Sequence, residues 1–290
     1  MQDTDPTKST ASQPPESLKP GIKDNQRARV AEFVQNHTGQ WIMLRTREGF
    51  DMEMLCEDAV TNHLLQHGSF EENLCTLVKN LLIEPATIID LGANFGFFSC
   101  LLGKWQPGSR IVAVEPNPML VDVVQRNLDR NGVVATLLPV ALGVEPGRAH
   151  LSFPENRPSR GTLGELPQSP RFSAIREVEI EVITWDRVFE ACEGGRVRIL
   201  KMDIEGYDVK VLAAMSVEQA ASVDHIICEF NEKRLAQCGS KRSDLLNASW
   251  LELFEVWVVD CAAVPVRLNS LDEFPGDSEI LWLRRRDTKN

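Results

Sequence analysis

Two acidic residues lie two positions apart directly after a hydrophobic run, and their carboxylates are candidates for catalysis or ligand binding. Asp203 and Glu205 follow residues 197–202, and both face the same side if the strand continues through them. In open α/β sheets, ligands bind at the carboxyl ends of the strands. We therefore consider four roles for the pair: a general base for a hydroxyl, ligands of a hard divalent metal, acceptors for an amino group of a cofactor, or caps of the next helix.

A glycine-bearing turn is a second candidate site. Residues 87–91 are β-branched and apolar, as in a buried parallel strand, and residues 97–102 are an apolar helix start. Glycines let a backbone approach a ligand closely, and the first N–H groups of a helix have no partner within it. The turn is therefore predicted to contact a cofactor through Gly92, Ala93, Asn94 and Gly96.

The acidic residues before and after this turn indicate which cofactor the turn binds. Glu115 closes the next predicted strand, nineteen residues after Gly96, and an acid there can accept both hydroxyls of a ribose. The glycine pattern is G-x-x-x-G rather than G-x-G-x-x-G, and Asp90 stands just before the turn. A carboxylate at this point suits a cationic cofactor with an amino-acid head better than a pyrophosphate. We therefore predict S-adenosylmethionine; the alternative is an ordinary strand–turn–helix with a solvated acid at Glu115.

These motifs, with others further along, resemble the FkbM-type methyltransferases. The resemblance is carried, in order, by D-L-G-A-N-F-G at residues 90–96, E-P-N-P at 115–118, Asn127, Asn131, P-V-A-L-G at 139–143, T-W-D at 184–186 and L-K-M-D-I-E-G at 200–206. It covers roughly residues 68–231, and K-x-D-x-E-G is its most specific element.

The resemblance implies an S-adenosylmethionine-dependent O-methyltransferase that acts on a hydroxyl of a sugar, glycan or polyketide-like acceptor. It adds Pro116, Asn117 and Asp203 to the predicted cofactor contacts and makes Asp203 and Glu205 the catalytic candidates, with no metal. A Gly-aromatic-Glu element is expected before the helix that precedes the glycine turn, and Gly68 to Glu72 resembles it. Glu71 or Glu72 would then face the methionine end of the cofactor. The alternative is a capping box, with Ser69 as N-cap and Glu72 as its partner.

The elements that must position these residues alternate as in a doubly wound sheet. The predicted core strands are residues 87–91, 110–114, 136–142, 197–202 and 225–230, followed by a helix at 245–254 and strands at 256–259 and 280–283. The closing strands fit an antiparallel last pair better than the parallel βα units of a dehydrogenase. We therefore expect an α/β fold of the class I methyltransferase type: Rossmann-like and doubly wound, with a mostly parallel seven-stranded sheet, an antiparallel last strand and an inserted hairpin.

The inserted hairpin is predicted from residues 149–153 and 177–184, whose glutamates alternate onto a solvated face. The loop between its strands, residues 154–174, is long enough to suggest a functional cover. We expect it to lie over the substrate and to carry Arg157, Arg160 and Arg171.

Three regions are expected along the chain. Residues 1–24 are rich in Pro, Ser, Thr and charge and predict a disordered tail. Residues 25–83 predict an accessory hairpin, at 40–45 and 50–55, and a helix. Residues 84–290 would form the methyltransferase domain.

Composition narrows the partners and the compartment. The net charge of −11 argues against nucleic acid as the main partner. The seven cysteines are scattered without a C-x-x-C, which favours a reducing compartment. No apolar stretch is long enough to span a membrane and no secretory signal is present, so we expect a cytoplasmic protein. The acceptor is expected to be a small molecule or a glycan, and the oligomeric state stays open.

Two other functions are weighed against methyl transfer. An NAD-binding oxidoreductase is disfavoured by the G-x-x-x-G turn and by the missing Tyr-x-x-x-Lys, because the only tyrosine is Tyr207. A relative that binds ligand without turnover would keep the same fold motifs.

Overall fold

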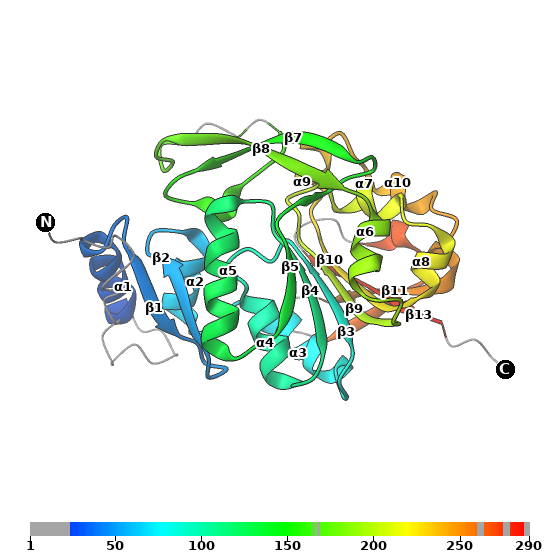
Figure 1. Ribbon diagram of the computed structural model, residues 1–290, viewed down its shortest axis with the longest axis horizontal. Coiled ribbons are helices and arrows are strands. Elements are labelled where there is room, and N and C mark those ends of the chain that lie inside the picture. The colour runs from blue at the N-terminus through cyan, green and yellow to red at the C-terminus, as the bar shows by residue number, and fades with distance from the viewer. Residues whose placement is uncertain (1–23, 165, 167–168, 260–263, 275–278, 287–290) are drawn as a thin grey trace, which may run out of the picture.

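The computed structural model describes residues 24–164, 166, 169–259, 264–274 and 279–286 (Figure 1). The predicted tail at residues 1–24 lies outside this part of the chain, except for Asp24, which begins the first helix.

A mostly parallel sheet forms the centre of the molecule. Within the described residues it has eight strands in the order β12-β11-β13-β10-β9-β3-β4-β5. The strands β5, β4, β3, β9 and β10 are parallel neighbours, whereas β13 runs antiparallel to both β10 and β11. The strands are β3 (Thr87–Leu91), β4 (Arg110–Val114), β5 (Ala135–Leu138), β9 (Val197–Met202), β10 (Val223–Phe230), β11 (Phe254–Val259), β12 (Pro265–Leu268) and β13 (Glu279–Arg285).

This topology confirms the expected class I methyltransferase fold with its antiparallel last strand. The described sheet has one strand more than the seven predicted, because the short β12 pairs with β11 at the edge.

Helices cover both faces of the sheet because its strands are apolar on both sides. Ile88 packs into one hydrophobic cluster with α3 (Glu72–Leu81), α4 (Phe97–Trp105) and α5 (Pro118–Asn131). The adjacent Ile89 points to the opposite face. There the second cluster joins residues of α6 (Trp185–Ala191), α7 (Asp208–Ala213), α8 (Val217–Ala221) and α10 (Arg242–Leu246).

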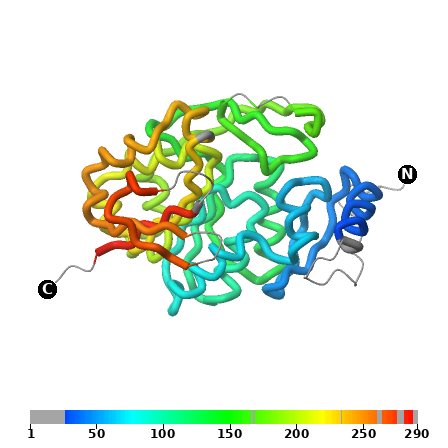
Figure 2. The backbone as a smooth tube through the Cα atoms, turned by 180° about the vertical axis from the view of Figure 1, so that it is seen from behind, coloured from blue at the N-terminus to red at the C-terminus, as the bar shows by residue number. Residues whose placement is uncertain are grey.

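The N-terminal elements pack against the first of these faces. They are α1 (Asp24–Asn36), the antiparallel hairpin of β1 (Trp41–Arg45) and β2 (Asp51–Leu55), and α2 (Ala59–His67). The predicted hairpin is confirmed, with Gly49 at a φ of 88° in its turn. Figure 2 shows these elements at the opposite end of the molecule from the C-terminal strands.

Two buried or part-buried asparagines of α5 join the hairpin to the core. Asn127 Oδ1 accepts from Glu53 N at 2.7 Å, and Asn127 Nδ2 donates to the carbonyls of Glu53 and Phe95 at 3.1 and 2.9 Å. Asn131 exchanges a similar pair of bonds with the backbone of Asp51. The free edge of β2 is thereby satisfied by side chains of α5.

The capping box predicted for Ser69 and Glu72 is wrong. The helix α2 ends at Gly68 in the left-handed region, at a φ of 77°, and α3 begins after Glu71, which is itself left-handed at a φ of 47°. The hydroxyl of Ser69 donates to the carboxylate of Glu48 in the hairpin turn and so does not cap α3.

Two other predicted elements are shorter than expected. The strand at 136–142 breaks after Leu138 because Pro139 has no N–H to donate to a ladder. The helix at 245–254 is only the end of α10 and a 3₁₀ turn at Leu251–Leu253, after which Phe254 enters β11.

The inserted sheet stands above the central sheet at the top of Figure 1. It contains β6 (Ala141–Leu142), β7 (Gly147–Pro154) and β8 (Ile175–Ile183) in the order β6-β8-β7, with β7 and β8 antiparallel as predicted. The glutamates at 177, 179 and 181 are exposed, which confirms the solvated face. A 3₁₀ turn (Pro158–Arg160) lies in the connection, and α9 (Glu232–Gln237) follows β10.

Among the described residues, no helix combines the length and apolar character needed to cross a bilayer.

Candidate active site

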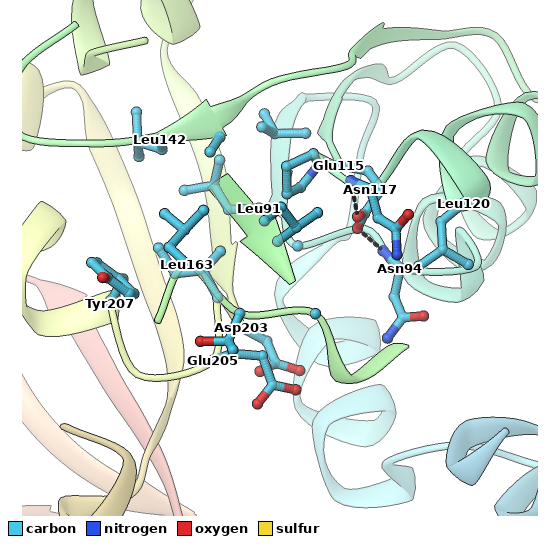
Figure 3. Close-up of a pocket in the computed structure, with 18 of the residues that line it drawn as sticks. Leu91, Asn94, Glu115, Asn117, Leu120, Leu142, Leu163, Asp203, Glu205 and Tyr207 are labelled. Carbon is cyan, nitrogen blue, oxygen red and sulfur yellow. Dashed lines mark hydrogen bonds between the residues drawn. The ribbon is translucent and has the colours of Figure 1, made fainter. Parts of the chain in front are cut away.

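The carboxyl ends of β3, β4 and β9 open into one pocket (Figure 3). The space between its lining residues is about 720 Å³, which includes open solvent. The strand order reverses between β3 and β9, so this is the crevice where doubly wound sheets bind ligands. Asp203 and Glu205 lie side by side in it, and Asn94, Glu115 and Asn117 gather opposite them.

Gly92 sets the floor of this pocket. Its φ is 74°, and a Cβ added here would lie 2.0 Å from the carbonyl oxygen of Asp203. The amide of Asp203 in turn donates to Leu91 O at 3.1 Å. Only glycine allows the two strand ends to approach so closely, so this residue fixes the position of Asp203 as well as the turn.

Glu115 is fixed by the backbone of both neighbouring turns. Its Oε2 accepts from Asn94 N and its Oε1 from Asn117 N, each at 2.8 Å. Burial raises its pKa to about 7, although these two hydrogen bonds lower it. The Asn94 Oδ1 atom is buried without a hydrogen-bond partner among the described residues. The Glu115 carboxylate and the unpartnered Asn94 Oδ1 therefore lie on the same wall of the pocket.

A buried ion pair lies behind the pocket. Asp90 accepts from Ser99 Oγ at 2.7 Å, and its Oδ1 lies 3.4 Å from Lys201 Nζ. That oxygen has no hydrogen bond of good geometry within the described chain. Lys201 also donates to Gly92 O at 3.2 Å. The register of β3 against β9 sets this pair, because it places Asp90 and Lys201 directly opposite each other.

Glu71 belongs to the same electrostatic group. Burial first and the charge of Asp203 second raise its pKa to about 8, while Lys201 opposes them. Burial by itself lowers the pKa of Lys201, but Asp90, Asp203 and Glu71 together hold it above its ordinary value. Asp90, Asp203 and Glu71 thus surround one buried ammonium, and Glu71 mostly holds its proton at neutral pH.

Glu205 extends from a strained loop. Its φ is 56°, and it pairs with Arg234 Nη1 at 2.8 Å, which also lies 3.4 Å from Glu229. Burial raises the pKa of Glu205 to about 7, Asp203 raises it as well, and Arg234 lowers it. Burial and Asp203 likewise raise the pKa of Glu229.

Neither Asp203 nor Glu205 caps α7. The amides of Ile204 and Gly206 donate to Asp208, at 3.1 and 3.2 Å, so that residue holds the loop. Burial raises the pKa of Asp208 to about 7. This role of Asp208 is not among the predicted ones, because it depends on how the loop folds back onto the start of α7.

The predicted site residues divide into two groups. Those that line the pocket are Gly92, Asn94, Glu115, Pro116, Asn117, Asp203 and Glu205. Asp90, Glu71, Ala93 and Gly96 are not among the lining residues, and Ala93 and Gly96 serve the turn itself. The amides of Gly92 and Ala93 both donate to Val114 O, and Gly96 donates to Ala93 O. The strand does not continue through Glu205 as expected, yet both acids reach the pocket.

The inserted sheet supplies a wall that sequence reasoning missed. Apolar side chains of its strands and connection line the pocket: Val140, Leu142, Leu151, Pro158 and Leu163. The connection is held by Ser159, whose Oγ and N donate to the buried Asp58 at 2.8 and 3.1 Å. This contact spans a hundred residues of sequence, so no local signal could have revealed it.

Comparison with known proteins decides the family. The model of the FkbM methyltransferase domain matches residues 90–254, more than half of the chain. The chain belongs to the FkbM methyltransferase family. It is 28% identical over 181 residues to methyltransferase sdnD of Sordaria araneosa, covering 53% of this chain and 70% of that protein. It is 26% identical over 162 residues to the hexuronic acid methyltransferase AglP of Haloferax volcanii, covering 56% and 62%.

Solved structures are more distant from this FkbM chain. The tRNA (uracil-54, C5)-methyltransferase of Pyrococcus abyssi, in complex with S-adenosyl-L-homocysteine, is 14% identical with a TM-score of 0.43, and the match covers 85% of this chain and 44% of that one. An O-methyltransferase from Bacillus cereus is 9% identical with a TM-score of 0.40, over 91% and 92%.

The cofactor of this FkbM protein is S-adenosylmethionine, and the site fits it. The unpartnered amide oxygen of Asn94 and the acids Glu71, Asp90 and Asp203 around Lys201 suit a ligand that brings a positive charge and hydrogen-bond donors. Within the described chain, no three or more His, Cys, Asp or Glu side chains are grouped so as to hold a metal ion.

Proposed function

We propose that the protein methylates a hydroxyl group of a small-molecule or glycan acceptor, with Glu205 as the general base. The observation that carries this proposal is the position of Glu205. It lines both the strand-end pocket and a second pocket on the side of α9. Because the Glu205 carboxylate lies at the junction of the two pockets, it can reach an acceptor bound in the second pocket.

A base with a pKa near 7 is what a hydroxyl acceptor requires. A hydroxyl is a weak nucleophile until a base removes its proton, whereas a carboxylate acceptor needs no base. The pKa of Glu205, raised to about 7 by burial and Asp203, makes it a stronger proton acceptor than an ordinary glutamate while leaving much of it ionised at neutral pH.

The other acids would hold the cofactor. Glu115 would accept the ribose hydroxyls, and Glu71 and Asp203 would face the amino-acid head. When bound, S-adenosylmethionine supplies an activated methyl group. The chain's own groups align the acceptor, keep water out with the apolar wall of the inserted sheet, and take the proton at Glu205 Oε1 or Oε2.

A sugar is the acceptor class we favour. One similar protein is named a hexuronic acid methyltransferase, and the second pocket is lined by polar as well as apolar side chains.

Incubation with methyl-labelled S-adenosylmethionine and a panel of sugars, uronic acids and hydroxylated polyketides tests the proposal. We expect label in a product that survives mild alkali, because a methyl ether is stable there and a methyl ester is not. Alkali-labile label would mean carboxyl methylation. No label with any acceptor, despite binding of the cofactor, would favour a relative that binds without turnover.

A further inference from the structure

Four arginines line the second pocket, which we call the arginine pocket: Arg157, Arg160, Arg171 and Arg234. It meets the strand-end pocket at Thr162, Glu205 and Tyr207, which line both. Glu205 is the one carboxylate that lines it within the described chain. Such a concentration of positive charge is unusual in a protein whose net charge is −11.

Three of these guanidinium groups form no close ion pair within the described residues, although Asp58 acts on Arg157, and Glu205 and Glu229 act on Arg160, at longer range. Among the described residues, Arg234 pairs with Glu205 and Glu229, but no carboxylate lies within ion-pair distance of Arg157, Arg160 or Arg171. The Nε of Arg157 is also buried without a hydrogen bond in this part of the chain. Arginines elsewhere on the surface, such as Arg148 and Arg187, do pair with glutamates. The free donors of the pocket are therefore available to a ligand.

The turn that bears two of the arginines is held in place. Asn117 Nδ2 donates to Pro158 O at 3.0 Å, and the adjacent Ser159 is bound twice by Asp58. Arg157 and Arg160 flank this fixed turn, so less conformational entropy is lost when they bind.

We infer that the arginine pocket binds an anionic group of the acceptor, a carboxylate or a phosphate, and so places a neighbouring hydroxyl at Glu205. Guanidinium groups form paired, charge-assisted hydrogen bonds with both kinds of oxyanion. The inference rests on the proposed function, since it assigns the acceptor class of that same site.

Calorimetry on the protein saturated with S-adenosylhomocysteine tests the pocket without turnover. The probes are methyl β-glucuronide, glucose 6-phosphate and the neutral methyl β-glucoside. We expect at least one anionic probe to bind about 10- to 100-fold more tightly than the glucoside, the range for charge-assisted hydrogen bonds, and to lose that advantage in high salt. The two anions separate carboxylate from phosphate recognition.

The variants Arg160→Gln and Arg171→Gln change exposed side chains, so the fold should survive. We expect each to weaken the anionic probe about tenfold, whereas the matched Arg187→Gln on α6 should not. Equal binding of all three probes, or unchanged anion binding in both pocket variants, would overturn the inference. The proposed function fails separately: anion binding that depends on these arginines, with no methyl transfer to any hydroxyl, would contradict the function and leave the pocket assignment standing.

Discussion

At the residue scale, Asp203 and Glu205 share a loop but differ in surroundings. Glu205 stands between the two pockets with a pKa raised to about 7, while Asp203 lies against Gly92 at the switch point. Since Asp208 holds the α7 loop, neither acid is needed as a cap. We therefore expect substitutions of both to affect turnover more than stability.

Glu205→Gln should lower kcat by about 10²–10⁴, as expected for loss of a general base, with little change in melting temperature. Because the base must be deprotonated, the wild-type rate should rise with pH through about 7. The rate of the variant should not show this rise. Asp203→Asn should also depress turnover. Initial rates with labelled cofactor from pH 5.5 to 9 measure both effects.

Glu190→Gln is the matched control, because Glu190 is an exposed glutamate on α6 that pairs with Arg187. Normal turnover in Glu205→Gln, with a clear drop in melting temperature, would show that this acid serves the fold.

Since we place no metal in the reaction, EDTA should leave the rates unchanged.

At the scale of elements, the N-terminal hairpin depends on Asn127 of α5. Asn127→Ala would leave the amide of Glu53 and the carbonyls of Glu53 and Phe95 without these partners in a buried place. Each unsatisfied group costs about 1–3 kcal/mol, so we expect a loss of at least that size in urea unfolding. Gln125→Ala, on the solvent side of the same helix, should be nearly neutral. Equal stability of the two variants would show that the hairpin does not depend on this contact.

Sequence patterns predicted the elements whose signals are local. The buried strands at 87–91 and 110–114 have the predicted bounds, because continuous apolar runs bounded by polar turns leave few alternatives. The capping box failed because a distant residue, Glu48, takes the hydroxyl of Ser69. Long-range competition of this kind leaves no mark on a local pattern.

The residues of the candidate site could be predicted from the sequence, but their contacts could not. Acids at strand ends must meet at one edge of a parallel sheet, so Glu115, Asp203 and Glu205 could be selected without coordinates. The partner of Lys201 could not, since it depends on the register of β3 against β9. The arginine pocket likewise needs the inserted sheet and α9 to be brought together.

At the scale of the whole molecule, buried and part-buried acids make stability depend on pH. The folded-state pKa is raised to about 8 for Glu71 and to about 7 for Glu115, Glu205 and Asp208. The folded state therefore binds protons more tightly than the unfolded state, whose carboxyl groups have ordinary values near 4. The stabilisation from these groups is complete below about pH 4 and is lost as pH rises to about 8.

We therefore expect the melting temperature to fall between pH 5 and 8, and to fall less with S-adenosylhomocysteine bound, because its ammonium group gives the carboxylates a counter-charge. Scanning calorimetry at constant ionic strength measures both curves. A melting temperature that rises across this range would contradict the assignment of these acids as buried and under-compensated.

A crystal structure of the complex with S-adenosylhomocysteine tests the central claim, that the strand-end pocket holds the cofactor beside Glu205, most directly. We predict ribose hydroxyls within hydrogen-bond distance of Glu115, the amino-acid head near Glu71 and Asp203, and the sulfur facing the junction with the arginine pocket. Cofactor bound elsewhere, or in this pocket with its sulfur directed away from Glu205, would contradict the account.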